Sequence, residues 1–347
     1  MMQLLRNTLK SAFLLLFFTV AYIFITKPVL AVSSVPVGVH ILSIDEISQA
    51  AELTAIPDSP DSWRYVTVPL TLSDLEKPIE WQAFFTAARK HKLVPLVRLT
   101  TSFSENSWNV PSRRNIVDSI SFLSGLEWPT DQRHIIVFNE VNHSKEWGGY
   151  IDPEEYADIF SFTAQWAHTE GRNFVVLPAA LDLAAPNGRQ TMEAFTYLSR
   201  MHSYDPEIFS YADAWNSHSY PNPGFSASPE RIGKNSLRGF QVELAWLSQK
   251  TGRDFKVYIT ETGWDASPSL ARWLPQYYEY AVNHIWNDPN VIAVTPFILQ
   301  GAPGPFEGFS FLTADGSPTA QYKAYKNALE KQYSKSDLLT AKIDIIE

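Results

Sequence analysis

The sequence contains no cysteine among its 347 residues, which excludes disulfides, thiol catalysis and cysteine-ligated zinc. Positive charge is also scarce, because 28 Lys and Arg stand against 37 Asp and Glu and the formal net charge is −9. A chain this acidic binds nucleic acid and anionic membrane surfaces poorly, so we expect neither as a partner. The one expected link to a membrane is the N-terminal segment, if it is retained.

Several cofactor-binding and catalytic motifs are missing as well. Residues 40–48, from the end of the first candidate strand onward, contain no glycine, whereas a dinucleotide-binding sheet needs a glycine-rich phosphate turn there. The sequence has no P-loop and no Gly-x-Ser-x-Gly elbow. No His-x-His pair lies on the first strand, which weakens the case for a metal-dependent hydrolase. We therefore expect no cofactor and no metal.

The N-terminal residues have the pattern of a targeting segment. Arg6 and Lys10 precede the uncharged run 11–26, which Lys27 ends, and small residues typical of a cleavage site follow. The run is slightly shorter than the roughly 20 residues of a spanning helix. We expect residues 1–31 to be a cleaved signal peptide, with an uncleaved membrane anchor as the alternative. Either reading exports the remainder, to the cell envelope or beyond it.

Short apolar or β-branched runs recur along the chain, each followed by a segment with helical patterning. They lie at 37–42, 65–70, 94–99, 134–139, 174–179, 213–218, 257–260 and 291–297. The middle runs are nearly continuous, as in strands buried on both faces. Eight such units predict an α/β fold, a single (β/α)8 TIM barrel over 35–332 with a C-terminal tail at 333–347. A doubly wound open sheet is the alternative.

Polar side chains stand at the ends of these predicted strands, where barrels of this type carry their chemistry. In chain order they are His40, Arg98, Asn139, Glu140, His218, Tyr220, Glu261 and Trp264. Two carboxylates, Glu140 and Glu261, thus arrive from the fourth and seventh strands. Two carboxyl groups flanking a small space are the minimum equipment for glycoside hydrolysis, since one protonates the leaving oxygen and the other attacks or activates water.

A structural interpretation of these residues has to be weighed beside the functional one. A single glutamate after a strand is most often a helix cap or a surface acid. Two of them, each closing an apolar run and accompanied by Arg98 and a His-x-Tyr at matching depths, favour a site. Trp147 and Trp108 could stack on a sugar ring or simply pack, because aromatic side chains serve both purposes.

The segments VFNEVN at 137–142 and YITETGW at 258–264 resemble the motifs of the clan A retaining glycoside hydrolases. The second is locally similar to the endo-β-1,3-glucanases, while the chain as a whole looks closer to the cellulase-like and family-39-like barrels. The resemblance covers about residues 35–332, but only the short motifs are specific. It implies a carbohydrate substrate and a two-step mechanism without a cofactor.

The resemblance also implies roles for single residues. Glu140 would be the acid/base, Glu261 the nucleophile, Asn139 a ligand of the sugar 2-hydroxyl and Arg98 the partner of the nucleophile. His218 and Tyr220 match strand-six residues that contact the two glutamates. Substrate contacts are also expected of Trp147 and His40, the latter at the edge of the core or of the sugar subsite. The chain departs from the family at strand eight, where a tryptophan is common; Trp264, Phe297 or Phe306 are candidates to replace it.

These observations predict an exported retaining glycosidase that acts on a β-linked oligo- or polysaccharide. They also predict a separation of about 5–5.5 Å between the two carboxyl groups. Two alternatives remain open at this point. One is a barrel of the same fold that binds cell-envelope polysaccharide without cleaving it, and the other is a transglycosylase that remodels such glycans.

Overall fold

The computed structural model describes residues 34–57, 60–171 and 173–343. The predicted signal peptide or anchor at 1–31 lies outside the described residues. Within the described part of the chain, no helix is both long enough and apolar enough to cross a membrane.

Within the described residues, eight parallel strands form the centre of the fold. Each of the eight predicted strands is confirmed, with small differences at its ends. They are β1 Ser34–His40, β2 Trp63–Leu70, β3 Leu93–Leu99, β6 Arg133–Val137, β7 Phe174–Pro178, β8 Trp215–His218, β9 Val257–Glu261 and β10 Val291–Val294. The pairing order is β1-β2-β3-β6-β7 in one run and β10-β9-β8 in the other. A short hairpin that the sequence did not predict, β4 Phe103–Ser104 with β5 Ser107–Trp108, follows β3.

Backbone hydrogen bonds join the two runs of strands into a closed barrel. On one side His40 N donates to Pro296 O at 3.1 Å, and Leu299 N donates to His40 O at 2.9 Å. On the other side Asp213 N donates to Val176 O at 3.0 Å. The open-sheet alternative is therefore wrong, because β1 meets β10 and β7 meets β8.

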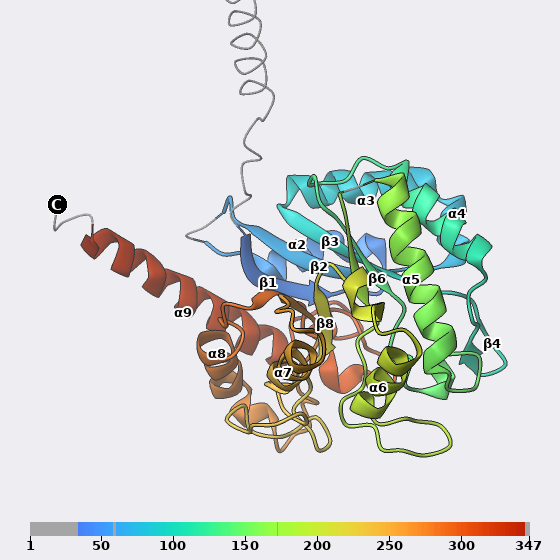
Figure 1. Ribbon diagram of the computed structural model, residues 1–347. Helices are drawn as coiled ribbons and strands as arrows, with labels where there is room; N and C mark the ends of the chain where they lie inside the picture. The colour runs from blue at the N-terminus through green and yellow to red at the C-terminus, as the bar shows by residue number, and fades with distance from the viewer. Residues whose placement is uncertain (1–33, 58–59, 172, 344–347) are drawn as a thin grey trace, which may run out of the picture. The chain divides into compact units, whose positions relative to one another are not determined.

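Helices alternate with the strands and lie outside them (Figure 1). They are α2 Ile47–Thr54, α3 Pro78–Lys90, α4 Arg113–Ser124, α5 Pro153–Glu170, α6 Ala194–Tyr204, α7 Gly239–Thr251, α8 Leu274–His284 and α9 Ala320–Ile343. Asp152 caps α5 by accepting from Glu154 N and Glu155 N, and Pro153 takes the first helical position. The final helix α9 continues to Ile343, so much of the predicted C-terminal tail is helical.

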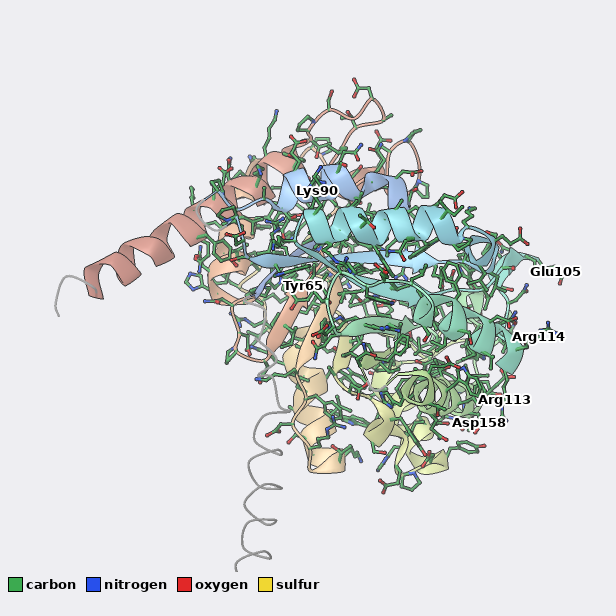
Figure 2. All side chains as sticks on the ribbon, turned by 90° about the horizontal axis from the view of Figure 1, so that it is seen from above. Tyr65, Lys90, Glu105, Arg113, Arg114 and Asp158 are labelled. Carbon is green, nitrogen blue, oxygen red and sulfur yellow. The ribbon has the colours of Figure 1, made fainter. Side chains whose placement is uncertain are left out.

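The barrel interior changes from apolar to polar along the strands. Tyr65, Leu96 and Tyr258 belong to a buried apolar cluster at the lower level. Tyr65 lies among the strands in Figure 2, whereas Lys90 is labelled at the outer surface. Strand alternation places residue 98 on the same inner face as residues 94 and 96, one level higher. Arg98 therefore lies directly above the apolar layer, as a buried cation near the C-terminal mouth of the barrel.

Candidate active site

A cavity of about 700 Å³ opens at the C-terminal ends of the strands. Its walls combine carboxylates with aromatic rings, a composition suited to sugar rings that carry hydroxyl groups. The predicted residues Arg98, Asn139, Glu140, Tyr220 and Glu261 all line it.

The two predicted glutamates meet in this cavity. Glu261 is the last residue of β9, and Glu140 follows β6. One side-chain oxygen of each glutamate and a ring nitrogen of His218 all lie within 4.8 Å of one another. Such a trio could hold a cation, but the Arg98 guanidinium already neutralises Glu261, so the donor set favours an organic substrate over a metal.

Four side chains surround the Glu261 carboxylate, and one of them, His40, places its ring nitrogen Nδ1 at 3.5 Å from Oε1. Arg98 Nη1 donates to Oε1 at 2.5 Å, and the Tyr220 hydroxyl donates to Oε2 at 3.1 Å. The His218 ring nitrogen Nδ1 lies 3.7 Å from Oε2. Burial alone would raise the pKa of Glu261, but the nearby His218 and Arg98 outweigh it and lower that pKa to about 2. Glu261 is therefore an ionised, oriented carboxylate at any physiological pH, as a nucleophile must be.

Glu140 stands in a different environment. Its Oε1 lies 2.9 Å from His218 Nδ1, and its side chain is 24% exposed against 10% for Glu261. Water can therefore reach Glu140 more readily, which suits a group that must give and take protons. The backbone around it is strained, with φ of +33° at Glu140 and +72° at Phe138, a conformation that occurs mainly where a site demands it.

His218 joins the two glutamates from behind. It is 2% exposed and does not line the cavity. Burial would lower the pKa of His218, but the carboxylates of Glu261 and Glu140 outweigh burial and raise it. The two carboxylates therefore favour the protonated form of the His218 ring.

His40 differs from its predicted role at the sugar subsite. The structure places it behind Arg98, with Nε2 at 3.3 Å from Arg98 Nη2, and it is fully buried outside the cavity lining. Burial and the Arg98 charge lower the pKa of His40 to about 3, so the ring is neutral. The predicted substrate contact is corrected: His40 lies behind both Arg98 and Glu261, with Nδ1 at 3.5 Å from Glu261 Oε1, and takes no part in the cavity lining.

Trp264 also departs from the prediction. It is fully buried, donates from Nε1 to Ala227 O, packs against Tyr277 and Tyr278, and takes no part in the cavity wall. Gly263, with φ of +128°, precedes it at the turn after β9. The structure therefore makes Trp264 a packing residue, which corrects the expected substrate contact.

Other aromatic side chains take the place of the expected tryptophan. Phe297 and Phe306 line the cavity beyond β10, with ring centroids 5.1 Å apart. Trp108, from the β4–β5 hairpin, lines another part of the wall. Trp147 borders the cavity but is only 1% exposed and donates to Glu155 Oε2 at 2.8 Å, so packing is its main role.

Further polar residues line the cavity that the strand-end pattern did not predict. His143 and Asp182 form a pair at 2.9 Å, and Asp265, Lys145 and Glu146 add charge. All lie in loops, where no periodicity announces a position. For His143, Lys145, Glu146 and Asp265 the available signal was proximity in sequence to Glu140 or Glu261, and Asp182 had no such signal.

A buried acid behind β8 supports the strand that carries His218. Glu243 of α7 is fully buried, accepts from Trp215 Nε1 at 3.0 Å and lies 2.5 Å from Ser217 Oγ. Burial raises the pKa of Glu243 to about 7. The carboxyl is thus favoured in its protonated form within the folded chain.

Replacement of Glu243 by glutamine is expected to remove one pH-dependent part of stability. The pKa of Glu243 is higher in the folded chain than in the unfolded chain, so its proton stabilises the folded state in full below about pH 4.5. This contribution is lost as the pH rises through about 7. Relative to the variant, the wild type should therefore lose up to about 3 kcal/mol of unfolding free energy across that window. Denaturant unfolding of both proteins at pH 4.5 and 7.5 measures the difference, and equal changes in both would contradict it.

Solved structures with similar folds are glycoside hydrolases. A family 39 enzyme from Bacteroides cellulosilyticus WH2 aligns with a TM-score of 0.58 and 15% identity over 86% of this chain and 64% of its own. The chain has the fold of these glycoside hydrolases. A family 5 enzyme from Streptomyces cattleya, in complex with Manβ1-4GlcNAc, aligns with a TM-score of 0.57 and 15% identity. The alignment covers 86% of this chain and 81% of that enzyme's chain.

The same fold occurs in an endo-β-1,3-glucanase. This family 128 enzyme from Pseudomonas viridiflava gives a TM-score of 0.52 at 16% identity, over 85% of this chain and 98% of its own. These families belong to clan A, which confirms the predicted resemblance at the level of the fold. The chain spans less than two thirds of the first two matched structures, 64% and 66%. No protein-family model and no curated protein matches the sequence.

Proposed function

We propose that the protein is an exported retaining glycoside hydrolase that cleaves a β-linked oligo- or polysaccharide. The observation that carries the proposal is the approach of Glu140 and Glu261 to within 4.8 Å, oxygen to oxygen. Retaining glycosidases hold their carboxyl groups about 5–5.5 Å apart, whereas inverting ones leave roughly 6.5–9.5 Å for a water molecule. Export is proposed from the sequence of residues 1–31 alone.

The reaction would proceed in two displacements. In the first, a Glu261 oxygen bonds to the anomeric carbon while the glycosidic bond breaks and Glu140 gives its proton to the leaving oxygen. In the second, Glu140 takes a proton from water, whose oxygen attacks the anomeric carbon and releases Glu261. The different environments of the two glutamates support this division of roles, because Arg98 and Tyr220 keep Glu261 ionised while Glu140 stays near water.

The cavity and the similar structures support the proposed substrate class. A wall of aromatic rings facing carboxylates suits neutral sugar rings. The structural neighbours include an endo-β-1,3-glucanase and an endo-β-1,4-glucanase, so β-glucans are the first substrates to test.

The deciding experiment combines a substrate panel with stereochemistry. Purified protein is incubated with β-glucans, mannans, galactans and xylans, with the Glu261→Ala variant as blank, and the first-formed anomer is followed by NMR. We expect a β-anomer, and products longer than the substrate would instead indicate transglycosylation. A first-formed α-anomer would contradict the retaining mechanism. Wild-type turnover no higher than that of the blank would contradict the proposal that the protein is a glycosidase.

Removal of a cavity aromatic is expected to weaken substrate binding more than turnover. Replacement of Trp108 or Phe306 by alanine should raise KM by roughly fivefold to tenfold, because a lost ring contact is worth about 1 kcal/mol or slightly more. Trp273 is a matched control, since it is 44% exposed and lies outside the cavity lining. An equal effect of Trp273→Ala on KM would show that the two rings are not substrate contacts.

A further inference from the structure

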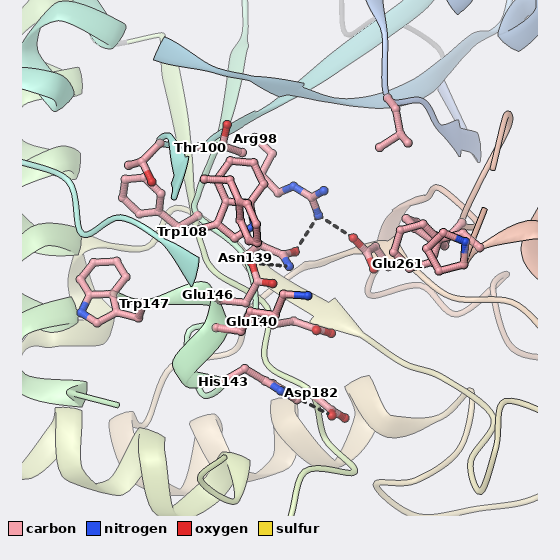
Figure 3. Close-up of a pocket in the computed structure, with 18 of the residues that line it drawn as sticks. Arg98, Thr100, Trp108, Asn139, Glu140, His143, Glu146, Trp147, Asp182 and Glu261 are labelled. Carbon is pink, nitrogen blue, oxygen red and sulfur yellow. Dashed lines mark hydrogen bonds and ion pairs between the residues drawn. The ribbon is translucent and has the colours of Figure 1, made fainter. Parts of the chain in front are cut away.

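The cavity holds a third glutamate that the two-carboxylate mechanism does not use. Glu146 closes the short helix η3, Ser144–Glu146, in the loop between β6 and α5. Its side chain lines the cavity, and Figure 3 shows it between Asn139 and Glu140. A carboxyl largely removed from water costs free energy unless polar partners or a function offset it.

The loop that carries Glu146 is tied down on both sides. Trp147 is buried and donates to Glu155 Oε2, and Gly148 N donates to Trp108 O at 2.7 Å. Ser144 N donates to Gln190 O at 2.8 Å. Because these bonds anchor the residues around it, the position of Glu146 in the cavity is a fixed property of the fold.

Glu146 ends a chain of contacts that begins at the nucleophile. Arg98 Nη1 donates both to Glu261 Oε1 and to Asn139 Oδ1, the latter at 2.7 Å. Since Arg98 can only donate, Asn139 must turn its oxygen toward Arg98 and its NH₂ group the other way. That group lies 3.4 Å from Glu146 Oε2, a long hydrogen bond that Figure 3 draws beside the two from Arg98.

We propose that Glu146 is a positioning residue of this site, which holds the Asn139 amide and, through Arg98, the orientation of Glu261. The inference rests on the proposed function, because it assigns a role within the same reaction. It adds a third glutamate, acting through Asn139 and not on the substrate's reacting atoms.

The charge of Glu146 gives this role a pH signature. The charged groups that face it are Glu140 from its own loop, Arg98 from β3 and Glu261 from β9, and its field also reaches His143. Burial and the neighbouring Glu140 raise the pKa of Glu146 to about 7. Above that pH, an ionised Glu146 is the stronger acceptor for Asn139.

The test compares Glu146→Gln and Glu146→Asp with Glu154→Gln. Glutamine keeps the shape and removes the ionisation, while aspartate keeps the charge and shortens the reach toward Asn139. Glu154 pairs with Arg200 on the outer helices and serves as the matched control. All variants are assayed as full chains on the substrate that the wild type cleaves best, across pH 4 to 9, with circular dichroism to verify folding.

We expect Glu146→Gln to lower kcat by about tenfold or more with KM changed by less than about threefold, because the loss is one of alignment. The rise in kcat/KM that ionisation of Glu146 adds near pH 7 should be missing from its pH profile, and Glu146→Asp should keep that ionisation step but lose kcat. A folded Glu146→Gln variant with the wild-type profile would overturn this inference alone. Wild-type activity no higher than that of Glu261→Ala would overturn the proposed function and this inference with it.

Discussion

Replacement of Glu261 by alanine is expected to lower kcat by about four orders of magnitude or more, because the reaction then lacks its attacking atom. Arg98 and Tyr220 would remain in place around the missing carboxylate, so the site would still bind sugar without forming the glycosyl-enzyme. The measurement is kcat on the best substrate of the panel, at saturating concentration. Circular dichroism and a thermal melt establish that the variant is folded.

A small external nucleophile should restore turnover in this variant. Azide can occupy the space left by the Glu261 side chain and attack the anomeric carbon directly, which gives a glycosyl azide of inverted configuration when the leaving group is an activated phenol. Glu261→Gln fills the same space and should not be rescued. Glu307→Gln, an exposed glutamate of the β10–α9 connection, is the control for loss of a carboxylate. Wild-type kcat in Glu261→Ala would remove this residue from the mechanism.

The strands were predictable because buried parallel strands leave a plain pattern in the sequence. Both faces of each strand are buried and must be apolar, so the strands appear in the sequence as continuous apolar and β-branched runs. These runs can be located without knowledge of the rest of the fold. Glu140 and Glu261 followed from the same pattern, since a charge that ends such a run has to emerge at the mouth of the barrel. The expected separation of about 5–5.5 Å came from the proposed retaining mechanism. The strand pattern alone could not give the distance, because it depends on closure between strands far apart in the chain.

Two of the errors arise in the loops. Trp264 follows Gly263, whose left-handed backbone turns the chain, and its ring packs among Tyr277 and Tyr278 instead of facing the cavity. No periodicity reports such a turn. Glu146 was missed for the same reason, since Gly148 and the buried Trp147 fix its loop through tertiary contacts. Residues at or just beyond the strand ends, such as Glu140 and Tyr220, were therefore predictable in position, whereas residues farther into the loops were not. The burial of His40 depends on packing inside the barrel, which the strand pattern does not report.

Replacement of Glu140 by glutamine is expected to separate the two steps of the reaction. With a sugar as leaving group, kcat/KM should fall by about a thousandfold, because general acid assistance contributes roughly 10² to 10⁴. With a dinitrophenyl glycoside the first step needs no proton and should continue. The second step still needs a base, so the glycosyl-enzyme should accumulate, visible as a burst of phenolate and as an added sugar mass on the protein.

The pattern of leaving groups makes this prediction specific to an acid/base. Glu80→Gln, an exposed acid in the first turn of α3, should behave as the wild type on both substrates. A structural defect at Glu140 would lower activity on both substrates alike and form no burst. If the barrel were a binding module, Glu140→Gln would leave glycan affinity unchanged and no substrate would be cleaved by either protein. One side-chain oxygen of Glu140 lies within 4.8 Å of one of Glu261. A burst in which the sugar is attached to Glu261 would therefore show that both residues act on the same glycosidic bond.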